Sequence, residues 1–199
     1  MLQVRIHGRG GQGVVTAAEL LALAAFDEGR YAQAFPSFGS ERMGAPVVSF
    51  CRIDEREIRV REPVMAPDVL IVIDPTLLHQ VDVFGGLTPE GFILINTTRS
   101  FDELGLGEFV AGFRHERLLT VPAGELAREH LVPPARPIAN AALLGGFAAL
   151  SGLVSLDAVV KAIRERFTGN VGEGNVAAAM AAYAWVADER RELSGAASG

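Results

Sequence analysis

Glycine dominates one short segment near the start of the chain, where residues 8–13 read Gly-Arg-Gly-Gly-Gln-Gly. The residues before it, 2–6, favour a strand, and the apolar, alanine-rich residues after it, 14–25, favour a helix. Glycine allows a positive φ and lets an anion approach the backbone, while the free N–H groups and the positive end of the helix dipole face that anion. The segment therefore predicts a strand, a tight turn and a helix N-terminus that together hold an anion such as a phosphate.

The glycine spacing also fits the G-x-G-x-x-G pattern of dinucleotide-binding folds. That pattern requires an acidic residue about 20 positions later, at the end of the second strand, where it binds a ribose hydroxyl. The predicted second strand, residues 31–35, ends without a carboxylate. Asp27 and Glu28 lie at the end of the preceding helix beside Gly29, where a helix C-cap is the simpler interpretation. We therefore do not expect this chain to bind NAD.

Composition and charge are those of a globular chain. Of its 199 residues, 49% are hydrophobic, enough for a full core, and we expect a single domain over residues 1–193 with a disordered tail at 194–199. The net charge of -6 disfavours a nucleic-acid-binding protein, which needs a basic surface. No apolar run reaches the roughly 18 residues that span a bilayer, because charges, glycine or proline interrupt each one. These observations indicate a cytoplasmic protein with neither nucleic acid nor membrane as a partner.

Cysteine and histidine usage limits the chemistry of the chain. Cys51 is the only cysteine, so this chain alone builds neither a disulfide framework nor a cysteine-ligated cluster. The four histidines show no metal-ligand spacing, and we predict no metal site. Cys51 ends the alternating run at residues 47–51, which is more typical of a buried strand residue than of a redox thiol.

Short β-forming runs alternate with helical patterns along the chain, an order that predicts an α/β fold. We expect a Rossmann-like open mixed sheet, mostly parallel, with helices on both faces. The unbroken apolar runs 69–73 and 92–95 are typical of central parallel strands. Residues 47–53 and 57–61 resemble an inserted antiparallel β-hairpin. The strands are expected at residues 2–6, 31–35, 47–53, 58–61, 69–74, 92–96 and 118–121.

The C-terminal third is expected to be helical. Alanines at 177–187 allow close helix packing, and the glycine-rich residues 169–175 form a loop at a subunit contact or an N-cap at Asn175. Asp74 followed by Pro75 predicts a further helix start between the central strands. The three C-terminal helices are expected at residues 138–150, 156–167 and 176–193.

A second unusual loop, residues 35–46, is rich in glycine and proline and carries the pair Glu41-Arg42. It leaves the second predicted strand, so we expect it at the carboxyl edge of the sheet beside the glycine turn, where open α/β sheets bind ligands. A surface ion pair in an ordinary loop explains the same residues equally well. Thr97 follows a central strand and reaches the same edge, although a helix cap accounts for it as well.

Three segments together resemble the gamma subunit of the 2-oxoacid:ferredoxin oxidoreductases, in particular the pyruvate/ketoisovalerate type. They are residues 8–13, residues 38–47 with 52–54, and residues 140–145, and the similarity extends to about residue 187. The loop departs from the family at Ser40 and Met43, where the family usually has proline and arginine. Its Gly-Ala-Pro continuation at 44–46 is similar to the enzymes that act on pyruvate.

The resemblance implies a role in the oxidative decarboxylation of a 2-oxoacid to an acyl-coenzyme A, with electrons passed to ferredoxin. Thiamine diphosphate, Mg and iron-sulfur clusters would lie on partner alpha, beta and delta subunits, since this chain lacks the cluster cysteines and a Gly-Asp-Gly segment. The gamma subunit would supply no catalytic residue but would border the coenzyme A region. The candidate binding residues are Gly8, Arg9, Gly10, Gly11, Gln12, Gly13, Ser37, Phe38, Gly39, Glu41, Arg42 and Thr97.

Within this set, Arg9 and Arg42 can supply fixed charge to phosphates, whereas Gln12 serves either the ligand or the turn itself. Two other functions remain open. The first is an architectural subunit whose glycine turn shapes an interface and binds no ligand. The second is a free-standing nucleotide-binding oxidoreductase. As a member of an assembly, it is expected to self-associate when isolated.

Overall fold

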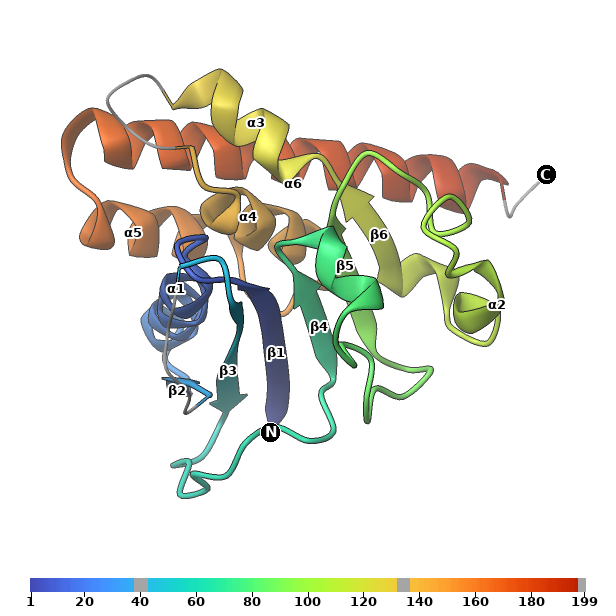
Figure 1. The fold of residues 1–199 in the computed structure, drawn as a ribbon. Coiled ribbons are helices and arrows are strands. Elements are labelled where there is room, and N and C mark those ends of the chain that lie inside the picture. The colour runs from blue at the N-terminus through green and yellow to red at the C-terminus, as the bar shows by residue number, and fades with distance from the viewer. Residues whose placement is uncertain (38–42, 132–136, 197–199) are drawn as a thin grey trace.

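The computed structural model describes residues 1–37, 43–131 and 137–196 (Figure 1). They contain a six-stranded sheet in the order β2-β3-β1-β4-β5-β6. Strands β1, β4, β5 and β6 are mutually parallel, and β3 runs antiparallel to both of its neighbours, β1 and β2. The strands are β1 (Leu2–Arg9), β2 (Tyr31–Pro36), β3 (Pro46–Asp54), β4 (Val69–Val72), β5 (Phe92–Asn96) and β6 (Leu118–Val121). The predicted mixed, mostly parallel α/β sheet is confirmed.

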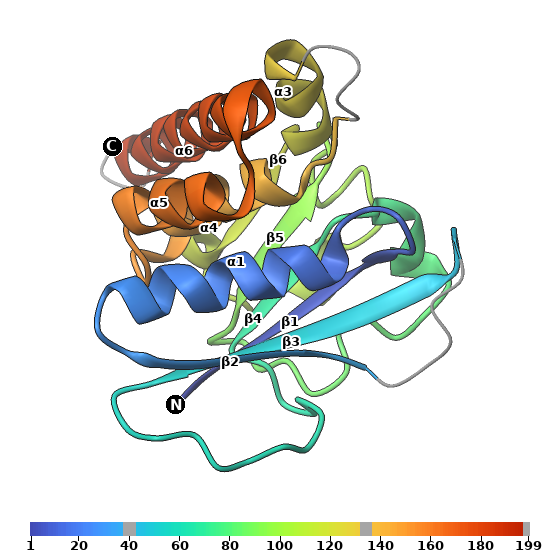
Figure 2. The ribbon, with the colours of Figure 1, turned by 90° about the vertical axis from the view of Figure 1, so that its left-hand side faces the viewer.

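The longer helices gather on one face of the sheet (Figure 2). They are α1 (Val14–Asp27), α3 (Ala123–His130), α4 (Asn140–Ser151), α5 (Leu156–Arg166) and α6 (Gly169–Ala196). The opposite face carries only short helical elements and loops over its β4-β5-β6 half. These short elements are the 3-10 helices η1 (Pro75–His79) and η2 (His115–Arg117) and the single-turn helix α2 (Gly107–Val110).

Strand alternation divides the apolar residues between two cores. In β1, Val4 and Ile6 face the long helices and join the larger core. In β4, Leu70 and Val72 face the other side and join a smaller core with η1 and α2. Because successive side chains of a strand point to opposite faces, both sides of the central strands are buried, as their unbroken apolar runs predicted.

The expected hairpin between residues 47–53 and 57–61 is wrong. Strand β3 pairs with β1 on one side and β2 on the other, so both of its hydrogen-bonding edges are already used. Residues 57–61 form no strand. Their segment instead binds the buried side chain of Arg52, which donates to the carbonyls of Val60 at 3.4 Å and of Glu62. The antiparallel pair that is consecutive along the chain is therefore β2–β3, connected through the second loop.

The last helix is longer than predicted at both ends. Residues 169–175 are helical rather than a loop, and Asn175 is no N-cap because its amide donates to the carbonyl of Val171, four residues earlier, at 2.8 Å. The glycines there permit close contacts: a Cβ on Gly172 would lie 2.4 Å from the carbonyl oxygen of Phe167. At the other end, α6 includes residues 194–196 of the expected disordered tail, and residues 197–199 lie outside the described residues.

The alanine-rich stretch of α6 packs closely on α4, as predicted. Ala178, Ala179 and Ala182 are fully buried. At the point of closest approach, a Cβ on Gly145 would lie 2.0 Å from the carbonyl oxygen of Ala179. Two helices can approach this closely only where no side chain separates their backbones, so Gly145 sets the spacing of α4 and α6.

Candidate functional site

Strands β1 and β4 lie side by side, and the chain leaves them in opposite directions. After β1 it enters α1, which packs over β2 and β3 on the face of the long helices. After β4 it enters η1 on the other face and continues to β5. This divergence makes the carboxyl ends of β1 and β4 the switch point at which open α/β sheets bind ligands. The glycine turn lies at this point.

The turn has the strand, turn and helix N-terminus that its sequence predicts. Gly11 and Gly13 have φ values of 87° and 71°, which residues with a side chain rarely adopt. Gly8 has no room for a side chain, because its Cβ would lie 2.6 Å from Cγ2 of Val14. Gly13 is the N-cap of α1, and no side chain of the described residues caps this helix. Its first N–H groups are therefore available to an external acceptor.

Main-chain bonds join the turn to the end of the second loop. The N–H of Gly10 donates to the carbonyl of Ala45 at 2.9 Å, and the N–H of Gly44 donates to the carbonyl of Gly10 at 3.1 Å. The end of the second loop thus lies beside the glycine turn, as predicted. The candidate residues Phe38, Gly39, Glu41 and Arg42 lie outside the described residues.

Arg9 binds the protein itself rather than pointing freely into the crevice. Its Nε donates to Oδ2 of Asp74 at 3.1 Å, and its Nη1 donates to the carbonyl of Gly44 at 3.1 Å. Its Nη2 donates to Oγ1 of Thr76 at 2.8 Å and to Oε1 of Gln80 at 2.7 Å. Every guanidinium nitrogen is therefore engaged, and the charge of Arg9 is balanced by a carboxylate.

The side chain of Gln12 forms hydrogen bonds within the turn, which is one of the two roles that the sequence left open. Its Oε1 accepts from the N–H of Arg9 at 2.7 Å, and its Nε2 donates to Oδ2 of Asp74 at 2.8 Å. Burial raises the pKa of Asp74, but hydrogen bonds from Thr76 and Gln12 and the charge of Arg9 outweigh that effect and hold the pKa below its ordinary value. Asp74 is thus an ionised centre that joins the ends of β1 and β4, and it also caps η1 as predicted.

We expect Asp74→Asn to lower the free energy of unfolding by about 1–3 kcal/mol, because it removes the partner of a mostly buried guanidinium. Urea denaturation near neutral pH measures this change. The matched control is Asp188→Asn, which breaks an exposed ion pair with Arg191 and should cost less than about 0.5 kcal/mol. Equal losses in the two variants would contradict a structural role for Asp74.

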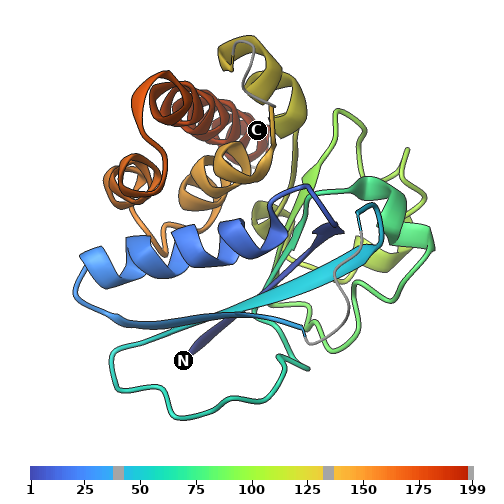
Figure 3. The same ribbon diagram turned by 60° about the vertical axis from the view of Figure 1, so that its left-hand side comes forward.

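A second helix begins beside the turn. Asn140, the first residue of α4, is buried, and its Nδ2 donates to the carbonyl of Gly13 at 3.3 Å. A Cβ on Gly13 would lie 2.5 Å from that nitrogen. Figures 2 and 3 show that the chain enters α1 and α4 from the same end of the molecule. The positive ends of two helix dipoles therefore meet at the turn, a contribution that the sequence motif at 140–145 did not reveal.

Two other candidate residues, Ser37 and Thr97, bond to neighbouring strands and turns rather than to the glycine turn. The N–H of Ser37 donates to the carbonyl of Val48 at 2.8 Å, extending the β2–β3 ladder. Thr97 accepts at Oγ1 from the N–H of Arg99 at 3.1 Å, and its own N–H donates to the carbonyl of Val121 at 3.0 Å. The helix-cap interpretation is wrong, because the next helix of the described residues, α2, begins only at Gly107. Within the described residues, no hydrogen bond joins either of them to the glycine turn. The side chain of Asn96 does connect neighbouring elements, since it bonds the carbonyl of Ile73 and the N–H of Gly124, both at 2.9 Å.

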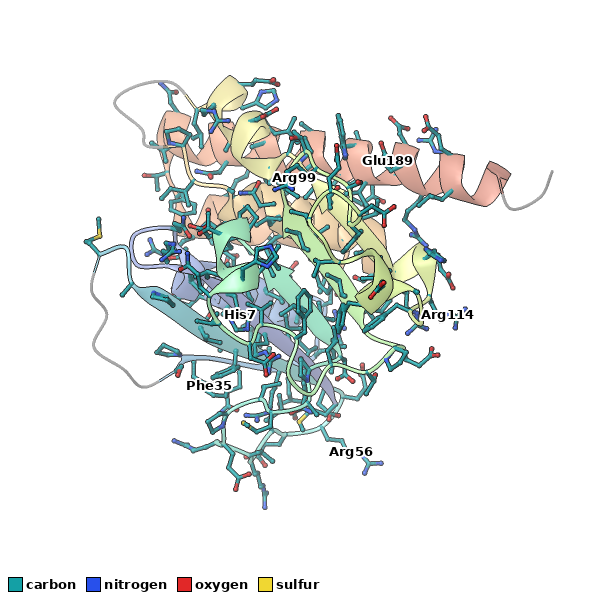
Figure 4. The ribbon with its side chains drawn as sticks, turned by 45° about the vertical axis from the view of Figure 1, so that its right-hand side comes forward. His7, Phe35, Arg56, Arg99, Arg114 and Glu189 are labelled. Carbon is teal, nitrogen blue, oxygen red and sulfur yellow. The ribbon has the colours of Figure 1, made fainter. Side chains whose placement is uncertain are left out.

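His7 lies just before the turn, on the strand face opposite the long helices (Figure 4). It is 4% exposed, and neither ring nitrogen has a hydrogen-bond partner in the part of the chain that the structure describes. Burial, reinforced by the charge of Arg5 and opposed by Asp82, lowers its pKa to about 4. Arg5 itself donates to the carbonyls of Val83 and Gly85 at 2.8 and 2.6 Å. Strand alternation puts His7 and Arg5 on the same face of β1. It does not show which elements cover that face.

Cys51 is a core residue, as predicted. It is fully buried, and burial raises the pKa of its thiol to about 12, so it is held as the unreactive thiol. The described residues contain no group of three or more histidine, cysteine, aspartate or glutamate side chains placed to hold a metal ion. No helix among them is both long and apolar enough to cross a membrane.

The open sheet with a glycine turn at its switch point defines a Rossmann-like class of fold. The chain belongs to the family described as pyruvate ferredoxin/flavodoxin oxidoreductase, whose model matches residues 3–185. The resemblance drawn from the three sequence segments is therefore confirmed at the level of the family.

Named relatives match nearly the whole chain. It is 46% identical over 183 residues to the pyruvate synthase subunit PorC of Methanothermobacter marburgensis, covering 92% of this chain and 96% of that protein. It is 48% identical, with the same coverage, to the common gamma subunit of the pyruvate/ketoisovalerate oxidoreductases of Pyrococcus furiosus. Among solved structures, the pyruvate oxidoreductase subunit PORC of Thermotoga maritima matches with a TM-score of 0.75 at 35% identity, over 92% of this chain and 94% of that one.

Proposed function

We propose that this chain is the gamma subunit of a multi-subunit 2-oxoacid:ferredoxin oxidoreductase that acts on pyruvate or a related 2-oxoacid. The support is the family match and the names of relatives that share nearly half of its residues. In this proposal, oxidative decarboxylation takes place in the cytoplasm on the alpha, beta and delta subunits, which hold the thiamine diphosphate, Mg and iron-sulfur clusters. The acyl group leaves on coenzyme A, and the electrons leave on ferredoxin.

The contribution of this chain is to bind a phosphate group of coenzyme A at the glycine turn. The observation that carries this proposal is the meeting of two helix N-termini at one point, with α1 uncapped by any side chain. Because Arg9 is already neutralised by Asp74, the phosphate is held by main-chain N–H groups and the two helix dipoles. Arg9 and Gln12 keep the turn in shape without touching the ligand.

Gly11→Val in the assembled complex tests this assignment. Gly11 is exposed in the turn, and a side chain there obstructs the approach of a phosphate to the backbone. We expect the KM for coenzyme A to rise by at least tenfold, the counterpart of losing about 1.4 kcal/mol of binding. The thiamine-bound intermediate should still form from the 2-oxoacid, because that step precedes the reaction with coenzyme A.

Gly29→Val is the matched control, since Gly29 has a similarly positive φ of 79° but ends α1 far from the turn. Both variants should lose a comparable amount of stability, of order 1 kcal/mol, from backbone strain. Only Gly11→Val should change the dependence on coenzyme A. If both complexes show the wild-type KM, the turn shapes an interface and the architectural function replaces ours.

A free-standing nucleotide-binding oxidoreductase is the other open function. Strand β2 ends at Pro36 without the carboxylate that binds a nicotinamide ribose. Near-ultraviolet and visible absorbance of the isolated chain, where reduced nicotinamides and flavins respectively absorb, together with an oxidoreductase assay of the chain alone, separates the two functions. A coloured preparation, or oxidoreductase activity of the chain alone, would favour the free-standing enzyme over a subunit of a larger complex.

The isolated chain is expected to self-associate. Met180 and Trp185 are 52% and 42% exposed on α6, an apolar surface that an assembly would cover. We expect sedimentation velocity to show dimers or larger species at tens of micromolar, and the double substitution Met180→Ser, Trp185→Ser to reduce them. Purely monomeric behaviour of the wild-type chain at such concentrations would contradict this expectation.

A further inference from the structure

A groove of about 550 Å³ lies beneath the C-terminal half of α6, far along the sheet from the glycine turn. Strand β6 forms its floor, α2 forms one wall, and α6 forms the other. Figure 1 shows α6 continuing past β6 toward the side of the molecule that carries α2. We call it the α6 groove, and its lining includes Asp102, Val110, Leu118, Thr120, Glu189 and Leu193.

The charges of the α6 groove are unbalanced. Two carboxylates, those of Asp102 and Glu189, line it together with His115, and no lysine or arginine does. In the described part of the chain, neither carboxylate takes part in an ion pair. Outside the lining, Arg114 pairs with Glu90 and Glu116, and Arg191 pairs with Asp188. The groove therefore presents two carboxylates that no ion pair within the described residues neutralises.

The floor and rim of the α6 groove suit an extended polypeptide. β6 is the last strand of the described sheet and pairs only with β5, so its outer edge carries main-chain groups outside the ladder. Leu118 of the β6 floor and Val110 of the α2 wall are buried and apolar, and Leu193 is 44% exposed at the rim. A segment that adds to such an edge gains main-chain hydrogen bonds, while its side chains enter the adjoining groove.

We propose that the α6 groove binds an extended segment of a partner subunit in which lysine or arginine alternates with apolar side chains. The basic groups pair with Asp102 and Glu189, and the apolar groups pack on Leu118 and Leu193. Charge complementarity favours this occupant, because an acidic segment or a phosphate would meet two carboxylates. The proposal rests on membership of a multi-subunit complex but not on coenzyme A binding at the glycine turn.

A fluorescent peptide probe with alternating valine and basic residues, Val-Arg-Val-Lys-Val-Arg-Val, tests the chemistry on the full chain by anisotropy. We expect saturable binding, and a loss of at least tenfold in affinity in Glu189→Lys and in Asp102→Lys. The matched control is Glu192→Lys, which makes the same charge change at an exposed position of α6 outside the groove. The control should bind the probe within twofold of the wild-type chain.

Three results would overturn the proposal: no saturable binding, equal binding of a probe with glutamate in place of the basic residues, or unchanged affinity in both groove variants. Loss of self-association in Glu189→Lys, without loss of probe binding, would assign the groove to a second copy of this chain and overturn it as well.

In the assembled complex, Glu189→Lys should weaken association with the partner subunits by at least tenfold. The KM for coenzyme A in the complexes that do form should stay unchanged. Gly11→Val should raise the KM for coenzyme A and leave association with the partner subunits unchanged. The two measurements therefore test the groove proposal and the coenzyme A proposal separately. Normal assembly of the Glu189→Lys chain would contradict the groove proposal and leave the coenzyme A proposal standing.

Discussion

Gly145→Ala is expected to destabilise the chain by about 3 kcal/mol, although alanine is the better helix former. The added methyl would lie 2.0 Å from the carbonyl oxygen of Ala179 and 2.6 Å from its carbonyl carbon. Backbone atoms cannot rotate away as a side chain can, so α4 and α6 must separate along their contact. Urea denaturation monitored by circular dichroism measures the change.

The neighbouring glycine of the same helix is the control. A Cβ on Gly146 would lie 3.4 Å from Cγ2 of Val186 and 3.6 Å from Cδ2 of Leu94, which are ordinary van der Waals distances. Gly146→Ala should therefore be neutral or should stabilise the chain by up to about 1 kcal/mol through helix propensity. If Gly145→Ala is as stable as Gly146→Ala, the two helices do not approach each other as closely as described.

His7→Leu is expected to remove a large part of the acid sensitivity of the fold. The pKa of His7 is about 4 in the folded chain, against an ordinary value of about 6.5. The folded state therefore favours the neutral ring, and its stability is highest above pH 6.5. It falls as the pH drops from 6.5 toward 4, by a total of about 3 kcal/mol, because the unfolded chain takes up the proton first.

The measurement is the difference in unfolding free energy between wild type and His7→Leu at pH 7.5 and at pH 4.5. Comparing differences cancels the contribution of the carboxylates that titrate in both proteins. Near neutral pH, the variant should be at least as stable as wild type, since leucine removes two unpaired buried nitrogens. His79→Leu, at an exposed position, is the control. If the difference in unfolding free energy between wild type and His7→Leu is the same at both pH values, His7 is hydrogen-bonded or hydrated in solution.

Much of the fold was predictable because its signals are local. The apolar runs at β4 and β5, the glycine turn before α1 and the cap formed by Asp74 each depend on a few neighbouring residues. The partner of β3 was not predictable in this way. Residues 57–61 are close in sequence and alternate suitably, yet β1 and β2 occupy both edges of β3. Strand pairing is decided by competition among all strands, which a local pattern does not record.

In the candidate site too, features set by neighbouring residues were predictable, and features that depend on distant residues were not. The sequence marked the glycines of the turn, and they do adopt the backbone conformations that only glycine accepts readily. It could not separate the roles of Arg9 and Gln12, because their common partner, Asp74, lies more than sixty residues away. Asn140 is more distant still and reaches the turn only because α4 begins beside α1.

By itself, the sequence determined that this chain is an α/β protein with a glycine turn between a strand and a helix at its start, and three short segments indicated its family. The α/β class and the glycine turn follow from propensity and spacing, which act within a few residues, whereas the family follows from the resemblance of the three segments. Only the tertiary structure decided that Arg9 is neutralised, that His7 is buried without a partner and that Glu189 stands over an open strand edge. Strand alternation tells which side chains share a face, but what covers that face depends on packing between elements distant in sequence.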